Sequence, residues 1–545
     1  MGEKFYIRND MVSRCLGYRS QITSSLGANI NVVRNEMGNV SQITASRSEQ
    51  GQWTASMQYN ELGQEIERIL PGDVISKWQY DITGRPTHHR ISSQSRNTRR
   101  RVYNWDVNHQ LRSMVNELTG VKVTYGYDEF SNLVWANQDS KFDFLYRSVD
   151  DVGNLYETKD KSDRVYGAGS RLLATQDAKF SYDEEGNLIE KVEKNGDTWK
   201  YEYYGNGMMS KVIRPDLTDV TFKYDSLGRR IEKSFEDKTT HFVWDGNTIL
   251  HEYSTQNVAD TLDNLKSSQT DTAIADNLVT WVFNDSFVPS AKITSEGHYS
   301  IITDYLGTPV EAYDEKGNRV WYAQLDIYGR VKEFTGEKDF IPFRYQGQYD
   351  DVEIGLYYNR FRYYDPEQGN YTQIDPIGLV GGNPTLYGYV SDPNTWIDIF
   401  GLSRAPSQIL AANLKKGGSK TAGHQAHHVI PTNVWKQYQT FFNDIGMGGL
   451  RDEAFNGMMI PSNPDTLKGS IFDFIHNTSH SAYNSNVMNR VGNIYAEFDN
   501  NLIDEKQARK QIRKLQMQLK NQLQTGHFSK DYVSSRKYPT CKRLG

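Results

Sequence analysis

Short stretches in which apolar and polar residues alternate recur through the first three quarters of the chain. Two clear examples are TWKYEYY at residues 198–204 and DVTFKYD at residues 219–225. Alternation over four to eight residues is typical of a strand with one buried and one exposed face. The pattern therefore predicts a mostly β structure for this part of the chain.

A motif of an aromatic residue, an aspartate and a Gly-Asn or Gly-Arg pair repeats through the same region, as in SYDEEGNLI and KYDSLGRRI. Successive copies lie 21–25 residues apart, except for one longer interval. Because aspartate caps its own turn and glycine tolerates a positive φ, the motif predicts a tight turn. We expect one β-hairpin for each copy, with the aromatic faces buried as the hairpins stack. The aromatic position, or its stand-in, is occupied by Tyr59, Tyr80, Trp105, Tyr127, Val149, Tyr182, Tyr203 and Tyr224.

These copies resemble the tyrosine–aspartate (YD) repeats of the Rhs family, over roughly residues 30–400. The resemblance implies a spiral of β-hairpins that forms a hollow shell. The alternative is an ordinary β-solenoid or an adhesive stalk that encloses nothing.

Residues 355–402, which begin GLYYNRFRYYDPEQG, resemble the repeat-associated core that ends the shell in Rhs proteins. The resemblance divides the chain into a shell at 1–354, the core at 355–402 and a C-terminal domain at 403–545. Two related pentads lie in the core, DPIGL at 375–379 and DIFGL at 398–402.

In the Rhs family the pentad aspartates resemble an aspartyl-protease pair that cuts the chain after the second pentad. The resemblance implies that Asp375 and Asp398 form this pair and that the scissile bond joins Leu402 to Ser403. Two carboxyl groups held close do not both ionise, so one acts as acid while the other activates water. The family usually has proline after the second aspartate, where this chain has Ile399, and proline would restrain the scissile segment. The alternative is that both aspartates only cap turns.

The charge balance changes at the same boundary. Residues 403–545 hold 19 Lys and Arg against 10 Asp and Glu, whereas residues 1–402 hold 43 against 58. A basic segment suits a polyanionic target such as nucleic acid, although a basic domain without such a target is also consistent with these counts. The only two cysteines, Cys15 and Cys541, exclude a disulfide framework and a CxxC metal motif.

Histidines cluster in the C-terminal domain, which holds six of the twelve in the chain. The stretch HQAHH at 424–428 and the Asn-Gly pair at Asn456 lie on two short apolar runs, which predict a β-hairpin. Further on, His476 and His480 lie at i and i+4, which places them on one face of a predicted amphipathic helix if that helix begins before them. Two helical histidines and one from the hairpin make a metal site with an open position, and a fourth histidine suits the role of general base.

The order His-His, Asn-Gly and His-x3-His resembles the ββα-metal (HNH) nuclease superfamily, in particular the branch named for its Ala-His-His signature. The resemblance implies a small α+β domain in which His428 activates water and Asn456 holds the hairpin that orients it. Ligands that are all imidazole favour Zn²⁺, with Mg²⁺ or Mn²⁺ as alternatives. The metal ligands that the resemblance implies are His427, His476 and His480. His424 and His527 are interpreted as surface residues, and His424 is the first substitute if a ligand is misassigned.

The segment DEKQARKQIRKLQMQLKNQLQTG predicts a long helix with a stripe of leucine and isoleucine. Its basic residues are candidate contacts to DNA phosphates, although a solvated helix face is the alternative. These candidates are Arg509, Lys510, Arg513 and Lys514.

The combined resemblance implies an antibacterial Rhs effector whose metal-dependent DNase is enclosed by the shell and released by self-cleavage. It also implies a cognate immunity protein, a secretion spike with an adaptor or chaperone, and often a type VI apparatus. We expect synthesis in the bacterial cytoplasm, secretion without a signal peptide and action in the cytoplasm of the target cell. The sequence shows no apolar run of about 18 residues and no signal pattern. With no spike-binding domain before residue 30, the chain is interpreted as part of a longer protein. The alternatives are an RNase or another metal hydrolase in the same shell, or a non-enzymatic adhesion protein.

Overall fold

The computed structural model divides into two compact units, with the main boundary along the chain between Ser403 and Arg404. The residues that the structure describes are 7–11, 19–36, 38–47, 51–61, 63–139, 144–256, 276–284, 287–378, 383, 385–402, 424–447, 451, 456–461 and 481–524.

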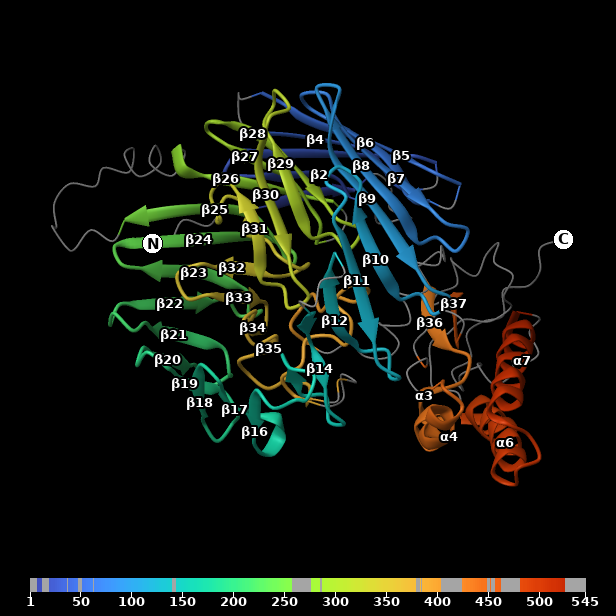
Figure 1. The fold of residues 1–545 in the computed structure, drawn as a ribbon. Helices are drawn as coiled ribbons and strands as arrows, with labels where there is room; N and C mark the ends of the chain where they lie inside the picture. The colour runs from blue at the N-terminus through green and yellow to red at the C-terminus, as the bar shows by residue number, and fades with distance from the viewer. Residues whose placement is uncertain are drawn as a thin grey trace, which may run out of the picture. The chain divides into compact units, whose positions relative to one another are not determined.

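Two large antiparallel sheets make up most of the first unit, and in both each strand pairs with the next strand along the chain (Figure 1). The 13-stranded sheet contains β1 (Ile7–Met11), β2 (Arg19–Ser24), β3 (Ala28–Arg34), β4 (Val40–Arg47), β5 (Trp53–Tyr59), β6 (Glu65–Leu70), β7 (Val74–Tyr80), β8 (Pro86–Ser93), β9 (Arg96–Trp105), β10 (Leu111–Asn116), β11 (Lys122–Tyr127), β12 (Leu133–Gln138) and β13 (Phe144–Tyr146). The 16-stranded sheet contains β16 (Arg164–Tyr166), β17 (Leu172–Thr175), β18 (Ala178–Tyr182), β19 (Leu188–Glu193), β20 (Thr198–Tyr203), β21 (Met209–Ile213), β22 (Asp219–Tyr224), β23 (Arg230–Phe235), β24 (Lys238–Asp245), β25 (Thr248–Gln256), β26 (Val279–Phe283), β27 (Pro289–Thr294), β28 (Gly297–Thr303), β29 (Pro309–Tyr313), β30 (Arg319–Leu325) and β31 (Val331–Thr335).

A break separates these two sheets at the one irregular interval of the repeat. The short pair β14 (Ser148–Val149) and β15 (Leu155–Tyr156) forms its own two-stranded sheet, and the 3₁₀ turn η1 (Ala168–Ser170) comes later, between β16 and β17. Val149, which replaces the repeat aromatic, is in this pair. The longer spacing in the sequence therefore marks the place where one sheet ends and the next begins.

The repeat turn has the geometry that its residues predict. In the copy at 183–187, the carboxylate of Asp183 accepts hydrogen bonds from the backbone N–H of Asn187 at 2.7 Å and from its side-chain amide at 2.9 Å. Gly186 has a φ of +87°, a left-handed conformation that favours glycine. The turn is therefore specified by local side chains, and it joins β18 to β19.

The repeat aromatic connects each hairpin to the preceding one. The hydroxyl of Tyr203 donates to the carbonyl oxygen of Leu188 at 2.8 Å, and Tyr224 donates to Met209 at 2.8 Å. In each case the acceptor is the first strand residue after the preceding repeat turn. Each such bond contributes about 1 kcal/mol. The same contact is made by Tyr59 to Val40, Tyr80 to Glu65, Trp105 to Pro86 and Tyr127 to Leu111.

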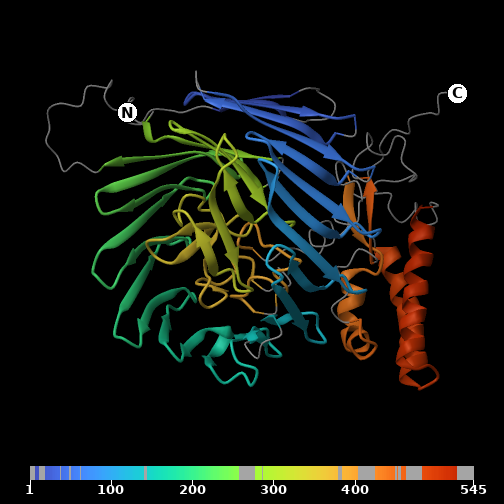
Figure 2. The same ribbon diagram turned by 45° about the horizontal axis from the view of Figure 1, so that its top comes forward.

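A small inner sheet packs against the 16-stranded sheet. It consists of β32 (Tyr349–Asp351), β33 (Leu356–Asn359), β34 (Arg362–Asp365) and β35 (Asn370–Tyr371). Arg230 of β23 forms a buried ion pair with Asp351, and its guanidinium lies 4.4 Å from the ring centre of Tyr358. In Figure 2 the large sheets form a curved wall, and this segment lies within the curve. The pentad aspartates Asp375 and Asp398 follow this inner sheet in the chain.

The second unit is a small α+β domain. Its described elements are β36 (His424–His428), α3 (Thr432–Gln437), α4 (Gln439–Asp444), β37 (Gly457–Pro461), α6 (Ser481–Asp499) and α7 (Glu505–Gln524). One apolar core joins them, and in it Trp435 stacks on Phe442 with ring centres 4.0 Å apart. Among the described helices of the chain, none is both long and apolar enough to cross a membrane.

The fold class predicted from the sequence is confirmed: the chain is mostly β, and a small α+β domain follows the repeats. The predicted hairpin of the C-terminal domain and both of its long helices are also present.

Candidate functional site

The two pentad aspartates lie at one buried site, although 22 residues separate them in the chain. The Arg362 guanidinium of β34 connects them, because its Nη2 lies 3.1 Å from Oδ2 of Asp375 and 3.5 Å from Oδ2 of Asp398. The guanidinium is also stacked 3.7 Å from the ring centre of Tyr371. An arginine that forms ion pairs with two buried carboxylates offsets part of the free-energy cost of removing them from water.

Asp398 makes further contacts that direct it toward the predicted scissile bond. Its Oδ2 accepts a hydrogen bond from the hydroxyl of Tyr371 at 2.9 Å, and its Oδ1 accepts one from the backbone N–H of Leu402 at 3.0 Å. Burial raises the pKa of this carboxyl to about 6, against the opposing effect of the Arg362 charge. Asp398 is therefore protonated at a higher pH than an exposed aspartate.

Asp375 has a second contact that fits the simpler turn-capping interpretation. Its Oδ1 accepts a hydrogen bond from the backbone N–H of Ile377 at 2.9 Å. The turn cap and the contact to Arg362 are made through different oxygens, so the two interpretations are compatible. Leu402 is described, whereas Ser403, the other side of the predicted scissile bond, lies outside the described residues.

The histidine strand of the second unit pairs with the Asn-Gly strand in the predicted hairpin. In the β36–β37 register, His427 lies opposite Met458 and His428 opposite Gly457. Both histidine side chains are buried, at 5% and 8% exposed. The two adjacent histidines are therefore part of the domain interior and are not solvent-exposed surface residues.

Asn456 holds the hairpin through its backbone and its side chain. Its carbonyl accepts from the N–H of Val429 at 2.7 Å. Its side-chain amide exchanges two hydrogen bonds with Ile430, accepting from N at 2.9 Å and donating to O at 3.2 Å. These bonds fix the two residues that follow His428, and the orienting role of Asn456 stays a prediction.

A residue that the sequence did not indicate supports Asn456. Gln516 of α7 is 2% exposed, and its Nε2 donates to Oδ1 of Asn456 at 3.1 Å. No motif marks this glutamine, which lies 60 residues further along the chain. The last helix of the domain is thus connected to the histidine hairpin.

His427 faces the helix that follows the predicted His-x3-His motif. Its ring centre lies 5.2 Å from that of Tyr483 in α6, and the hydroxyl of Tyr483 donates to the carbonyl of Val429 at 2.6 Å. His476 and His480 lie outside the described residues, as does the side chain of His424. Within the described part, no three His, Cys, Asp or Glu side chains are grouped closely enough to share a metal. As an imidazole, the side chain of the predicted ligand His427 suits a transition metal.

The basic residues of α7 differ in their surroundings. Arg509 is exposed, and its Nε donates to the carbonyl of Ile445 at 2.7 Å, so one donor is already used at the end of α4. Lys510 and Lys514 are exposed. Burial, together with the nearby charge of Arg513, lowers the pKa of Lys520 to about 8. The four candidate phosphate contacts stay predictions.

Comparison with known protein families assigns both units. Residues 71–379, more than half of the chain, match the model of the Teneurin YD-shell family. The chain belongs to the YD-shell family. In this YD-shell protein, residues 411–519 also match the AHH family, described as a nuclease family of the HNH/ENDO VII superfamily with conserved AHH. Both resemblances inferred from the sequence are thereby confirmed.

Relatives of this YD-shell protein carry different activities in their names. A protein named double-stranded DNA deaminase toxin A from Burkholderia cenocepacia is 29% identical over 456 residues, which cover 78% of this chain and 30% of the relative. A probable deoxyribonuclease, RhsA, from Dickeya dadantii is 31% identical over 259 residues, which cover 45% of this chain and 17% of the relative. The tRNA nuclease WapA from Bacillus subtilis is 28% identical over 296 residues, which cover 52% of this chain and 11% of the relative. The chain thus spans less than a third of the length of these relatives.

The fold of this YD-shell protein also resembles a solved structure, titled as the Tc holotoxin pore of Photorhabdus luminescens with a TccC3-D651A mutation. The TM-score is 0.53 at 15% identity, over 73% of this chain and 21% of that one. At this identity the likeness concerns the fold alone.

Proposed function

We propose that the C-terminal domain is a metal-dependent endonuclease that acts on DNA, within an antibacterial toxin of the Rhs type. The observation that carries this proposal is the AHH hairpin, in which the contacts of Asn456 hold the residues next to His428. The match of this domain to the AHH nuclease family supports it.

In the proposed mechanism, His428 acts as general base and takes the proton of the water that attacks the phosphodiester. Asn456 and Gln516 keep the hairpin, and therefore this imidazole, in place. His427, His476 and His480 would hold a divalent ion, which supplies Lewis-acid stabilisation of the charge that develops on the phosphate. Three imidazole ligands favour Zn²⁺, with Mg²⁺ or Mn²⁺ as the alternatives.

Plasmid degradation by the purified full chain tests the proposal. We expect linear and fragmented DNA in the presence of Zn²⁺, Mg²⁺ or Mn²⁺, and intact plasmid in excess EDTA. Re-addition of one ion identifies the metal. RNA in a parallel reaction tests the alternative substrate, which the name of the WapA relative suggests. Degradation that continues in EDTA after dialysis would contradict the metal requirement.

We further propose that the chain cleaves itself between Leu402 and Ser403. The observation that favours this second activity is the buried Asp375–Arg362–Asp398 arrangement, with the N–H of Leu402 on Asp398. One carboxyl group protonates the leaving amide nitrogen while the other accepts a proton from the attacking water. Arg362 keeps the two groups at the same site.

The rate of self-cleavage should depend on pH. The groups that face Asp398 are Arg362, Tyr371 and Asp375, and burial sets the pKa of its carboxyl at about 6. With protonated Asp398 as the acid, the rate constant is highest below pH 6 and falls by about tenfold for each pH unit above it. Timed denaturing gels between pH 5 and pH 8 measure this profile. A rate that does not change, or that rises above pH 6, would assign the acid to another group.

The biological setting belongs to the same proposal. A cognate immunity protein would block the nuclease in the producing cell, and a secretion spike with an adaptor or chaperone would deliver the toxin. Synthesis in the bacterial cytoplasm and action on DNA in the target-cell cytoplasm complete it.

A further inference from the structure

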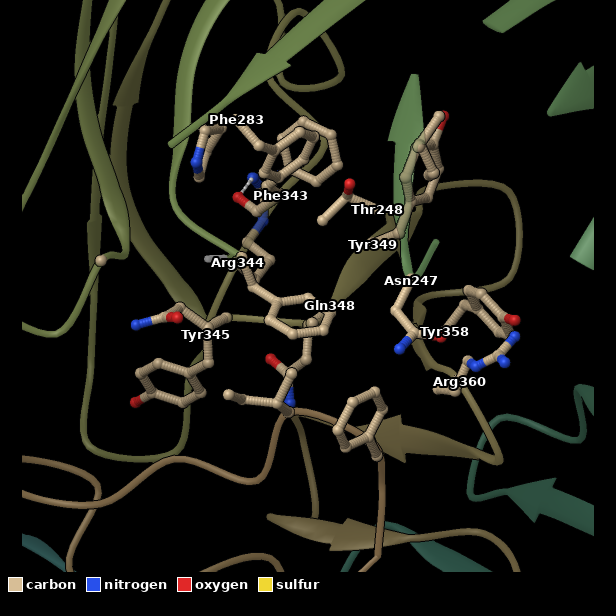
Figure 3. A pocket seen from close by; sticks show the side chains of 18 of the residues that line it. Asn247, Thr248, Phe283, Phe343, Arg344, Tyr345, Gln348, Tyr349, Tyr358 and Arg360 are labelled. Atoms are coloured by element: carbon tan, nitrogen blue, oxygen red, sulfur yellow. Dashed lines mark hydrogen bonds between the residues drawn. The ribbon is translucent and has the colours of Figure 1, made fainter. Parts of the chain in front are cut away.

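The segment that ends at the predicted scissile bond borders an aromatic pocket of the first unit. Ile399 and Phe400 line this pocket, whose empty volume is about 530 Å³. Figure 3 shows Phe283, Phe343 and Tyr345 among the other side chains that surround it. The pocket is thus formed by the shell and by the segment that joins the proposed catalytic residue Asp398 to Leu402 at the predicted scissile bond.

Phe400 is held in this pocket by its ring and by its backbone. The ring contacts that of Phe287 edge to face, with ring centres 5.3 Å apart. The carbonyl of Phe400 accepts a hydrogen bond from the N–H of Phe361 at 3.3 Å. A charged side chain at position 400 would lose these apolar contacts and its own hydration.

Gly347 leaves the space that the backbone of the segment occupies. A Cβ atom at this position would lie 2.0 Å from the carbonyl oxygen of Ile399 and 2.8 Å from its carbonyl carbon. These two are backbone atoms, so the contact would be relieved only by displacement of the segment itself. At the other end, the carbonyl of Gly401 accepts from Nε of Arg362, the same guanidinium that contacts both aspartates.

We propose that Gly347 and the aromatic pocket form the binding subsite that places the segment 399–402 on the aspartate pair, and that Gly347 is a positioning residue for self-cleavage. This inference rests on the proposed self-cleavage. Rhs proteins usually have proline at the position of Ile399. In this chain the close approach of Gly347 to the carbonyl of Ile399 restrains the segment at the same position. Its specificity is for an aromatic or large aliphatic side chain at position 400.

The test compares Gly347→Ala with Gly355→Ala in the full chain, made by cell-free translation with His428→Ala in every variant to silence the proposed nuclease. Both glycines have a positive φ, +88° and +68°, so both variants carry similar backbone strain. Only Gly347 has an atom within 4 Å of the added Cβ. We expect the first-order rate of cleavage to fall at least tenfold in Gly347→Ala and to stay within threefold of the parent in Gly355→Ala.

Two further measurements separate positioning from damage to the fold. The drop in Gly347→Ala should be the same at every pH from 5 to 8, since the carboxyl groups are unchanged. Phe400→Asp should also lose at least tenfold, whereas Phe400→Leu, which stays apolar, should stay within threefold. These substitutions alter the segment and leave the shell intact, so they decide the matter if Gly347→Ala fails to fold, as judged by protease resistance.

The outcomes distinguish this inference from the activity on which it rests. Equal rates for Gly347→Ala and Gly355→Ala, or a parent-like rate for Phe400→Asp, overturn the subsite while Asp398→Asn still blocks cleavage. Cleavage in Asp398→Asn overturns the assignment of the aspartate pair instead. A parent chain that never cleaves overturns both.

Discussion

Plasmid degradation by the His428→Ala variant is expected to be slower than that of the parent by about 10²- to 10⁴-fold, the usual contribution of a general base. The remaining side chains keep the hairpin, because its hydrogen bonds come from Asn456 and the backbone. The loss should therefore affect turnover and leave the thermal midpoint of the domain within a few degrees of the parent. Supercoiled plasmid with the preferred ion, followed over time on agarose, is the measurement.

Two controls define what the His428 result means. His527→Ala changes a histidine that the sequence places outside the AHH motif, and it should degrade plasmid at the parent rate. His427→Ala should raise the metal concentration needed for half-maximal activity, because it removes a proposed ligand. A His428→Ala protein that retains activity within threefold of the parent would exclude this imidazole as the base.

The second large effect is expected for Asp398→Asn, which should leave the chain as one 62.6 kDa band on a denaturing gel where the parent gives two fragments. Asparagine keeps the shape of the side chain and can still hydrogen bond to the N–H of Leu402. It has no carboxyl proton to give and does not take one up, so the acid–base pair is lost. Mass spectrometry of the parent fragments should place the cut after Leu402.

Asp392→Asn is the matched control for this experiment. Asp392 is also buried and also precedes a turn, where its carboxylate accepts hydrogen bonds from Asn394 and Thr395. If pentad aspartates act only as turn caps, the two substitutions should have similar effects. Loss of cleavage in Asp398→Asn alone supports the catalytic pair, and equal loss in both variants contradicts it.

The repeat made the fold predictable from the sequence, because each copy contains its own turn. The aspartate and glycine of a copy such as Asp183 and Gly186 form a hairpin without help from distant residues. The sequence motifs that we recognised ended at Tyr224, yet the sheet continues to β31 with the same turn around Gly317 and Gly329. The later copies were missed although AYDEKGNRV at 312–320 keeps the full motif, because their spacing is shorter: Asp304, Asp314 and Asp326 lie only 10 and 12 residues apart.

The sites were predictable where a local signature marks them. The resemblance to the AHH branch pointed to Asn456 beside the His428 strand, and the resemblance to the Rhs core pointed to Asp375 and Asp398, which both contact Arg362. Arg362 and Gln516 could not be found in this way. Their roles come from packing of β34 and α7 against residues far away in the chain, and neither lies in a pattern of its own.

The tyrosine contact between neighbouring hairpins has a consequence for synthesis. Since the hydroxyl of Tyr203 binds a carbonyl made 15 residues earlier, a hairpin with this contact finds its acceptor in chain that was synthesised before it. Nearest-neighbour arrays of this kind grow by addition to a folded end. The wall can therefore assemble in the order of translation, and the domain that carries the histidine hairpin is made after it. The repeat sheets can thus be complete before the proposed nuclease domain has been synthesised.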